Sequence, residues 1–164
     1  MLLKNLNKKS IGLIILSAIC LGFAYNSISK NGISLIYTEK EYSQLDETGS
    51  HESDSIPLLI SLNQTIKFHD DPEIIFIDAR DKWDYEEGHI SRAINIQEYK
   101  FDPQLDKLAE LSREAKYVIY CGGDDCDISK RLAEKLAAID FKNLFIYSGG
   151  FDEWSALNMP VEIE

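Results

Sequence analysis

Three uninterrupted apolar runs constrain the fold of this 164-residue chain more than any other feature of its sequence. They are residues 74–77 (IIFI), 117–120 (YVIY) and 144–147 (LFIY). A strand with one face in water alternates apolar and polar residues, whereas a strand buried on both faces is apolar throughout. The runs therefore predict the inner strands of a parallel sheet.

Helix patterns lie between these strands, which indicates an α/β fold. We expect helices at residues 82–87, 103–111 and 129–139, the last two with regularly spaced leucines. Earlier in the chain, LLIS after Pro57 predicts a short strand. Ser61 and Gln64 then form an S-x-x-Q capping pattern for a helix that ends near His69.

Cys121 stands where a cysteine can react. Residues 117–136 (YVIYCGGDDCDISKRLAEKL) carry it from a strand into a glycine-bearing loop that opens into an amphipathic helix. Loop amides and free N–H groups of the first helical turn can stabilise a thiolate there. Asp78 follows the run at 74–77, so both residues are expected where ligands of parallel sheets bind, at the carboxyl ends of the strands. A small apolar cysteine buried at a strand end is the alternative, and the local pattern leaves both open.

The N-terminus has the pattern of a secretory signal or a signal anchor. Lys4, Lys8 and Lys9 precede residues 11–25 (IGLIILSAICLGFAY), which contain no charge. At about 1.5 Å per residue this run is shorter than a hydrocarbon core of about 30 Å, so flanking residues must extend it across a membrane. We expect a retained anchor, with cleavage after Ala24 and secretion as the alternative. The lysines predict a cytoplasmic N-terminus and a periplasmic or extracellular remainder.

A polar linker follows this segment. Residues 38–55 (TEKEYSQLDETGSHESDS) are acidic and poor in large aliphatic side chains, so they cannot fold independently. His51 lies among them without clustered metal-ligating neighbours, which predicts a solvated side chain. We divide the chain into a signal segment at residues 1–30, a linker at 31–55 and one folded domain at 56–164.

The formal net charge of −11 is unevenly distributed. Residues 1–30 contain four lysines and no acid, so the remainder holds 13 basic and 28 acidic residues, a net charge of −15. Such a surface repels phosphate backbones, which argues against nucleic-acid binding. The three cysteines are Cys20, Cys121 and Cys126. Because Cys20 lies in the apolar segment, at most one disulfide can form within the folded domain.

The order of the motifs resembles that of the rhodanese-like domain family. IDARDKWDYEEGHISRAINI starts at Ile77, YVIYCGGDDC at Tyr117 and LFIYSGGFDEWSALNMPVE at Leu144. The shared pieces are aspartate-x-arginine after a strand, G-H-I before A-x-N, a strand-borne cysteine and a late G-G-x-x-x-W helix. The resemblance covers about residues 56–164. It implies a three-layer α/β/α fold with a central parallel sheet, and a sulfurtransferase that needs no cofactor or metal.

In this resemblance Cys121 is the catalytic nucleophile, which carries a sulfane sulfur as a persulfide and passes it to a thiol acceptor. Amides of the following loop hold the persulfide. We assign this loop to Gly122, Gly123, Asp124, Asp125 and Cys126. Asp78, Arg80 and His89 are assigned supporting roles, because a buried ion pair and a hydrogen-bonded histidine more often lock a loop than do chemistry. Tyr147, Phe151 and Trp154 are expected in the core.

The loop departs from the family pattern in its charge. Many members place a cationic or hydroxyl residue in this loop, whereas CGGDDC is acidic, and Asp127 follows it. Carboxylates here oppose thiolate formation and repel dianions such as thiosulfate. Arg92 stands after Gly-His-Ile-Ser and would offer a positive charge, although we expect it to be exposed and uninvolved. A related phosphatase would need an arginine at the position of Asp127.

Cys126 is the second departure. It lies five residues after Cys121 and can attack a persulfide or form a disulfide if the two α-carbons come within about 7 Å. A buried cysteine at the start of the helix is the alternative.

The sequence thus predicts an envelope-located sulfurtransferase acting through Cys121 on a donor and acceptor that are small molecules or proteins. Two alternatives stay open. The domain could be a noncatalytic protein-interaction module, or Cys121 and Cys126 could form a thiol–disulfide redox switch.

Overall fold

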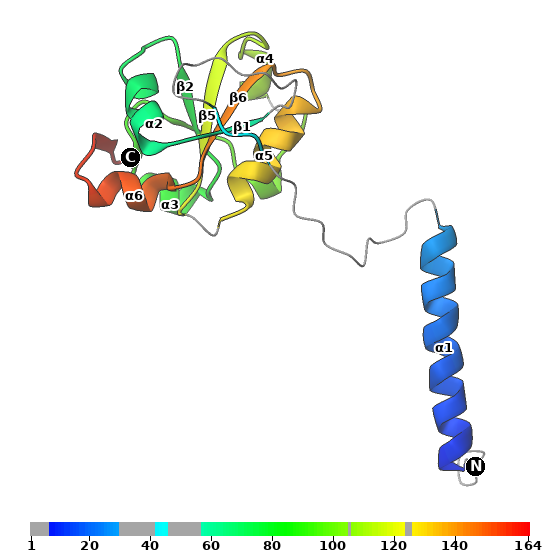
Figure 1. Cartoon of the computed structure of the whole chain (residues 1–164). Coiled ribbons are helices and arrows are strands. Elements are labelled where there is room, and N and C mark those ends of the chain that lie inside the picture. The colour runs from blue at the N-terminus through cyan, green and yellow to red at the C-terminus, as the bar shows by residue number, and fades with distance from the viewer. Residues whose placement is uncertain (1–6, 30–41, 46–56, 105, 124–125) are drawn as a thin grey trace. The chain divides into compact units, whose positions relative to one another are not determined.

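The computed structural model describes residues 7–29, 42–45, 57–104, 106–123 and 126–164. The chain consists of two compact units, Met1–Lys40 and Glu41–Glu164. Within the described ranges, the first unit contains helix α1 (Lys8–Ile28), and the second contains the remaining helices and strands (Figure 1).

Five parallel strands form the centre of the second unit. In sheet order they are β1 (Leu58–Ile60), β6 (Asn143–Tyr147), β5 (Lys116–Tyr120), β2 (Ile75–Asp78) and β4 (Ile94–Asn95). The three apolar runs form β2, β5 and β6, each within one residue of its predicted bounds. The parallel sheet is therefore confirmed, together with the short strand after Pro57.

Helices cover both faces of this sheet, so the three-layer architecture is confirmed (Figure 1). One face packs against α2 (Leu62–His69), α3 (Lys82–Glu87) and α6 (Gly150–Ala156), and the other against α4 (Asp106–Ala109) and α5 (Ile128–Ala137). Successive residues of β5 point to opposite faces. Val118 and Tyr120 join the first core, whereas Tyr117 and Ile119 join the second. Both faces of β5 are buried, which explains why residues 117–120 form a continuous apolar run.

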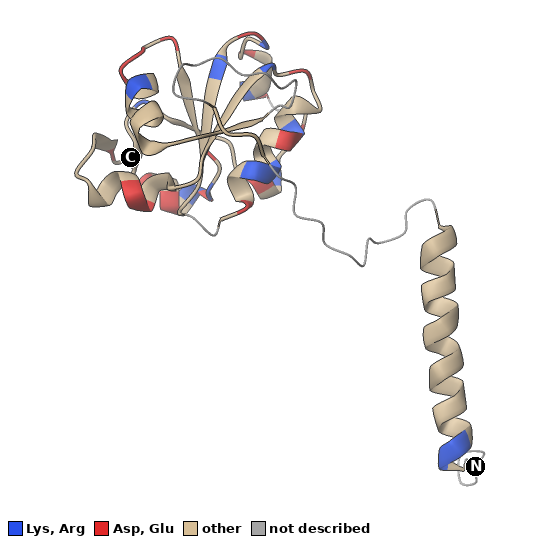
Figure 2. Ribbon diagram, in the orientation of Figure 1, with Lys and Arg blue, Asp and Glu red and all other residues tan. Residues whose placement is uncertain are grey.

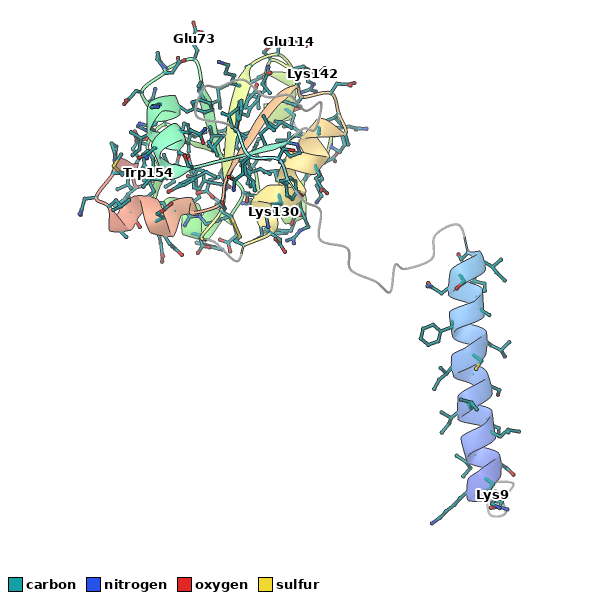
Figure 3. All side chains as sticks on the ribbon, viewed as in Figure 1. Lys9, Glu73, Glu114, Lys130, Lys142 and Trp154 are labelled. Carbon is teal, nitrogen blue, oxygen red and sulfur yellow. A yellow bond between two sulfur atoms is a disulfide. The ribbon has the colours of Figure 1, made fainter. Side chains whose placement is uncertain are left out.

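The aromatic side chains near the C-terminus belong to the first core. Trp154, labelled in Figure 3, is fully buried. It contacts Phe76 and Tyr147, and it donates its indole N–H to Pro160 O at 2.9 Å. Tyr147 is buried as well, and Phe151 is half-buried. The expectation that these residues lie in the core holds fully for Trp154 and Tyr147.

Side-chain caps begin two helices of the second unit. The predicted capping box of α2 is present, since Ser61 Oγ accepts from Gln64 N and the Gln64 side chain accepts from Ser61 N. The helix ends at His69, as predicted. Asp81 caps α3 with its own side chain alone, accepting from the amides of Trp83 and Asp84. These bonds satisfy N–H groups that have no partner inside the helix.

The helix predicted at residues 103–111 is wrong in extent, because α4 runs only from Asp106 to Ala109. Before it, the Asp102 carboxylate accepts from Gln104 N, so the chain makes a local turn in place of a first helical turn. After it, Arg113 donates to Leu108 O and the chain bends toward β5. Leu108 is still fully buried.

Three two-residue strands and one short helix were not predicted. Strands β3 (His89–Ile90) and β7 (Val161–Glu162) form a separate antiparallel pair, β4 is the edge of the main sheet, and η1 (Glu98–Lys100) is a 3-10 helix. A strand of two residues is too short to show a periodic pattern of apolar side chains. Such strands form because the surrounding fold places them beside a partner strand, so they cannot be predicted from the sequence.

Helix α1 is longer than the apolar run that predicted it. Its 21 residues span about 32 Å at about 1.5 Å per residue, enough to cross a hydrocarbon core. Its only charges are lysines in the first turn (Figure 2). Length and composition therefore allow a membrane anchor, and a signal sequence meets the same criteria.

Residues 42–45 of the predicted linker lie against the domain. Leu45 N donates to Leu59 O and Leu59 N donates to Ser43 O, both at 2.9 Å, so this piece extends the sheet beside β1. The neighbouring residues 46–56, among them His51, lie outside the described ranges.

Candidate active site

Cys121 follows the last residue of β5, at the edge of the sheet where three strands end together. Asp78 of β2 and Tyr147 of β6 both pair in register with Tyr120 of β5. The chain then passes through the loop from Cys121 to Asp127 and enters α5 at Ile128. The structure thus brings Cys121 and Asp78 to one edge, as the sequence predicted.

The start of α6 holds the first residues of this loop. Phe151 N donates to Cys121 O at 2.8 Å, and Asp152 N donates to Gly122 O at 2.7 Å. Gly150 has a φ of +61°, and a Cβ atom there would lie 2.5 Å from Cys121 O. Only glycine fits this position without strain or collision. This contact explains physically why a G-G-x-x-x-W helix accompanies a strand-borne cysteine.

Cys121 and Cys126 are joined by a disulfide, with their α-carbons 6.4 Å apart. Cys121 is fully buried, whereas Cys126 is partly exposed. The sulfur of Cys121 faces the loop and the start of α5, because Cys126 O lies 3.2 Å and Ser129 Oγ 3.6 Å from it. The predicted geometric condition for a Cys121–Cys126 bond is therefore met.

The disulfide-bonded loop is not arranged to hold a thiolate. A carbonyl oxygen, that of Cys126, faces the Cys121 sulfur, and a thiolate requires hydrogen-bond donors instead. The Ser129 hydroxyl is a donor of the right kind and is itself buried. Asp124 and Asp125, whose amides belong to the predicted persulfide-binding loop, lie outside the described residues. The role of this loop stays a prediction that concerns the reduced protein.

Asp78 and Arg80 form a buried ion pair beside the loop. Asp78 accepts from Arg80 N, Nε and Nη2 at 2.7–3.1 Å, and Arg80 Nη2 also donates to Gly88 O at 2.7 Å. The guanidinium lies over the Phe151 ring, 4.4 Å from its centroid. Burial opposes the charge of Arg80, but its hydrogen bonds to Asp78 and the charge of that carboxylate raise its pKa. The pair therefore ties the end of β2 to the end of α3 and to α6.

Tyr120 extends this buried network. Its hydroxyl accepts from Ile90 N at 3.0 Å, and burial followed by the charge of Asp78 raises its pKa far above the ordinary value. The phenol is thus neutral at any physiological pH. Sequence analysis missed Tyr120 and also Ser129, because each stands in a pattern that predicts only core packing.

His89 is positioned by groups other than the cysteine loop. Its Nδ1 lies 2.8 Å from Tyr85 O, its Nε2 lies 3.8 Å from Glu162, and its ring stacks on Tyr85 at 3.8 Å. Arg92 is exposed; its backbone N–H donates to Glu162 at 3.1 Å and its side chain donates to His69 O. These contacts join the β3–β7 pair to α3 and α2.

The described residues contain no group of three or more histidine, cysteine or acidic side chains placed to hold a metal ion.

Comparison with known proteins agrees with this geometry. Residues 61–157 match the family model of the rhodanese-like domain. The chain belongs to the rhodanese-like domain family. Among solved structures, the BH2092 protein from Bacillus halodurans is similar to it, with a TM-score of 0.54 and 33% identity over 62% of this chain and 72% of that one. The rhodanese-like domain of the Alr3790 protein from Anabaena sp. has a TM-score of 0.48 and 24% identity, over 63% of this chain and all of that one.

The curated proteins that are similar to this rhodanese-like chain are much longer than the chain itself. The tRNA uridine(34) hydroxylase of Salmonella paratyphi B is 44% identical over 100 residues, which make up 56% of this chain and 28% of the hydroxylase. The protein of the same name from Sodalis glossinidius is 33% identical over 90 residues, 52% of this chain and 25% of the relative. The chain thus spans about a quarter of the length of these relatives.

Proposed function

We propose that this rhodanese-like domain is a sulfurtransferase in which the thiolate of Cys121 takes a sulfane sulfur from a donor, holds it as a persulfide and delivers it to a thiol acceptor. The observation that carries the proposal is the position of Cys121. It stands at the carboxyl end of β5 with its sulfur turned toward the loop that opens into α5. A cysteine that served only packing would direct its sulfur between strands and helices instead.

The surroundings of Cys121 can stabilise the anionic forms of this cycle once the disulfide is open. The N-terminus of α5, a helix of 10 residues, contributes the positive end of its dipole, and Ser129 contributes a hydroxyl donor. Asp127 opposes this effect less than its charge suggests, because Lys130 Nζ lies 3.0 Å from its carboxylate. Gly122 and Gly123 leave space for loop amides to converge on sulfur.

The charge of the domain bears on the substrate. Residues 31–164 carry a net charge of −15, and three aspartates belong to or adjoin the loop, so a dianion such as thiosulfate is repelled. We therefore propose a low-molecular-weight or protein persulfide as the donor. The relatives are named for a tRNA, but an acidic surface disfavours a phosphate backbone, so we propose a sulfur substrate in place of RNA.

We further propose that α1 anchors the domain to a membrane, with the N-terminus in the cytoplasm and the domain in the periplasm or outside the cell. Lys8 and Lys9 lie in the first turn of α1, ahead of its apolar residues, in agreement with the positive-inside tendency. A disulfide such as Cys121–Cys126 persists in oxidising compartments. Protease treatment of intact and permeabilised cells tests this orientation, since digestion only after permeabilisation of the inner membrane contradicts it.

Persulfide loading tests the sulfurtransferase proposal. The reduced full chain in detergent micelles, carrying Cys20→Ser and Cys126→Ser, is treated with glutathione persulfide and digested for mass spectrometry. We expect the peptide that contains Cys121 to gain one sulfur atom, and the further change Cys121→Ser to abolish the gain. The persulfide should then pass to an added thiol. Absence of sulfur on Cys121 after loading contradicts the proposal.

The complete burial of Cys121 favours a second candidate, a noncatalytic module that binds a partner protein. This candidate predicts that Cys121 stays unmodified under the same treatment even when the disulfide has been reduced.

A further inference from the structure

The disulfide shows which atoms of the loop can reach each other. Cys126 N donates to Gly123 O at 3.0 Å. The α-carbons of Cys121 and Cys126 are 6.4 Å apart, inside the usual range for a disulfide. The fold that contains β5 and α5 therefore allows the two sulfurs to be bonded to each other.

We propose that Cys126 is a second catalytic nucleophile, which releases the sulfur carried by Cys121 as hydrosulfide. This inference rests on the proposed persulfide at Cys121. It adds an activity to sulfur transfer, because the carried sulfur is reduced inside the loop even when no external acceptor takes it.

The reaction has three balanced steps. First, the Cys121 thiolate attacks the outer sulfur of a donor RSSH, which forms Cys121–S–SH and expels the thiolate RS⁻. Second, the Cys126 thiolate attacks Sγ of Cys121, so the Cys121–Cys126 bond forms, the bond to the outer sulfur breaks, and HS⁻ leaves with the electron pair. The sulfane sulfur gains two electrons and the two cysteines lose them. Third, an external dithiol reduces the disulfide and becomes a disulfide itself, which restores both cysteines.

The contact between the two sulfurs favours attack on the inner sulfur of the persulfide. Attack on the outer sulfur would move the sulfane sulfur to Cys126 and form no bond between the cysteines. The structure contains the bond that inner attack produces. Hydrosulfide is also the better leaving group, since its conjugate acid is stronger than a cysteine thiol.

Unequal burial sets the direction of the third step. Cys121 is fully buried, whereas Cys126 is partly exposed. An incoming dithiol therefore meets Cys126 first, forms a mixed disulfide with it and expels Cys121 as a thiolate beside the Ser129 hydroxyl. The exchange thus returns Cys121 in the nucleophilic form that the next donor needs.

Single-turnover release of hydrosulfide tests this inference. The full chain with Cys20→Ser, in detergent micelles, is reduced, freed of reductant and mixed with one equivalent of glutathione persulfide. A sulfide electrode follows hydrosulfide, and alkylation before mass spectrometry identifies thiols, persulfides and disulfides. We expect close to one equivalent of hydrosulfide per chain, with Cys121 and Cys126 protected from alkylation by their bond.

The matched variant adds Cys126→Ser. We expect it to keep the extra sulfur on Cys121 and to release hydrosulfide at least about tenfold more slowly, because the attacking thiolate is missing. Equal release from both proteins, or a stable persulfide in both, overturns the inference while leaving the proposed function intact. If neither protein acquires sulfur on Cys121, the proposed function itself fails.

Discussion

The neighbouring strands β2 and β5 end side by side, yet different interactions hold the chain after each strand. At the end of β2, Asp78 and Arg80 form a buried ion pair whose hydrogen bonds hold the turn. At the end of β5, Cys121 is held by amides of α6 and by a disulfide that a reductant can open. The end of β2, which we call the β2 corner, is therefore a fixed scaffold. The end of β5, the cysteine corner, lies beside it and can change its covalent bonding.

Removing Asp78 should have the largest effect on stability. Asp78→Ala leaves the Arg80 charge buried without its partner, and we expect a loss of about 3–5 kcal/mol in the free energy of unfolding. Urea denaturation of the full chain in micelles measures it. Asp140→Asn is the control, because it removes an exposed ion pair with Lys142 and should leave stability unchanged. Equal midpoints for both variants would show that the β2 corner is not a scaffold.

Gly150→Ala should disturb the cysteine corner through the backbone. The new Cβ meets Cys121 O and Gly122 O at 2.5 and 2.7 Å in a left-handed conformation, so strain and overpacking together cost about 2–4 kcal/mol. Gly122→Ala is the control, since the nearest atom to its Cβ, an Asp152 oxygen, lies 3.9 Å away. The same denaturation experiment decides: a Gly150→Ala protein as stable as Gly122→Ala contradicts the close approach of α6 to the loop.

Reduction of the disulfide should have a smaller effect. Opening the short loop between Cys121 and Cys126 releases chain entropy in the unfolded state, which lowers the free energy of unfolding by about 2 kcal/mol. Denaturation with and without dithiothreitol measures this difference, and Cys126→Ser should show none. A domain that unfolds completely on reduction would mean that the loop is part of the scaffold.

The smallest effect concerns pH and His69. Burial, followed by the charge of Arg92, lowers the pKa of His69, although Ser91 and nearby acids partly oppose this. The unfolded chain then binds the proton more readily, so stability is complete above about pH 6.5 and declines as the pH falls through the lower folded value. Between pH 7 and pH 5, the wild type should lose more stability in urea denaturation than His69→Gln does. Parallel losses would contradict the assignment.

Sequence patterns predicted four of the five strands of the main sheet, all except β4, and the position of Cys121 at the end of one of them. The continuous apolar runs have one physical cause, since alternate residues such as Tyr117 and Val118 are buried in different cores. The cap at Ser61 is equally local. By contrast, the length of α4 depends on a turn at Asp102 that competes with the helix.

The bonding of the site could not be predicted from the sequence, because it depends on contacts between distant segments. The alternatives left open for Cys126, a thiol or a disulfide, have the same sequence and differ only in redox state. Ser129 and Tyr120 look like ordinary core positions until the fold places them beside Cys121 and Asp78. Gly150 belongs to the G-G-x-x-x-W motif of the family resemblance, but only the structure gives its physical reason, the close approach to Cys121 O.

The ionisation of Cys121 in the reduced protein tests the central claim most directly. Iodoacetamide alkylation of the full chain with Cys20→Ser and Cys126→Ser is followed against pH, folded in micelles and unfolded in urea. We predict that the folded rate reaches half its maximum well below the ordinary thiol pKa of about 8.5, and that the unfolded rate does so near that value. A folded thiol that reacts only above about pH 8.5 would contradict the account.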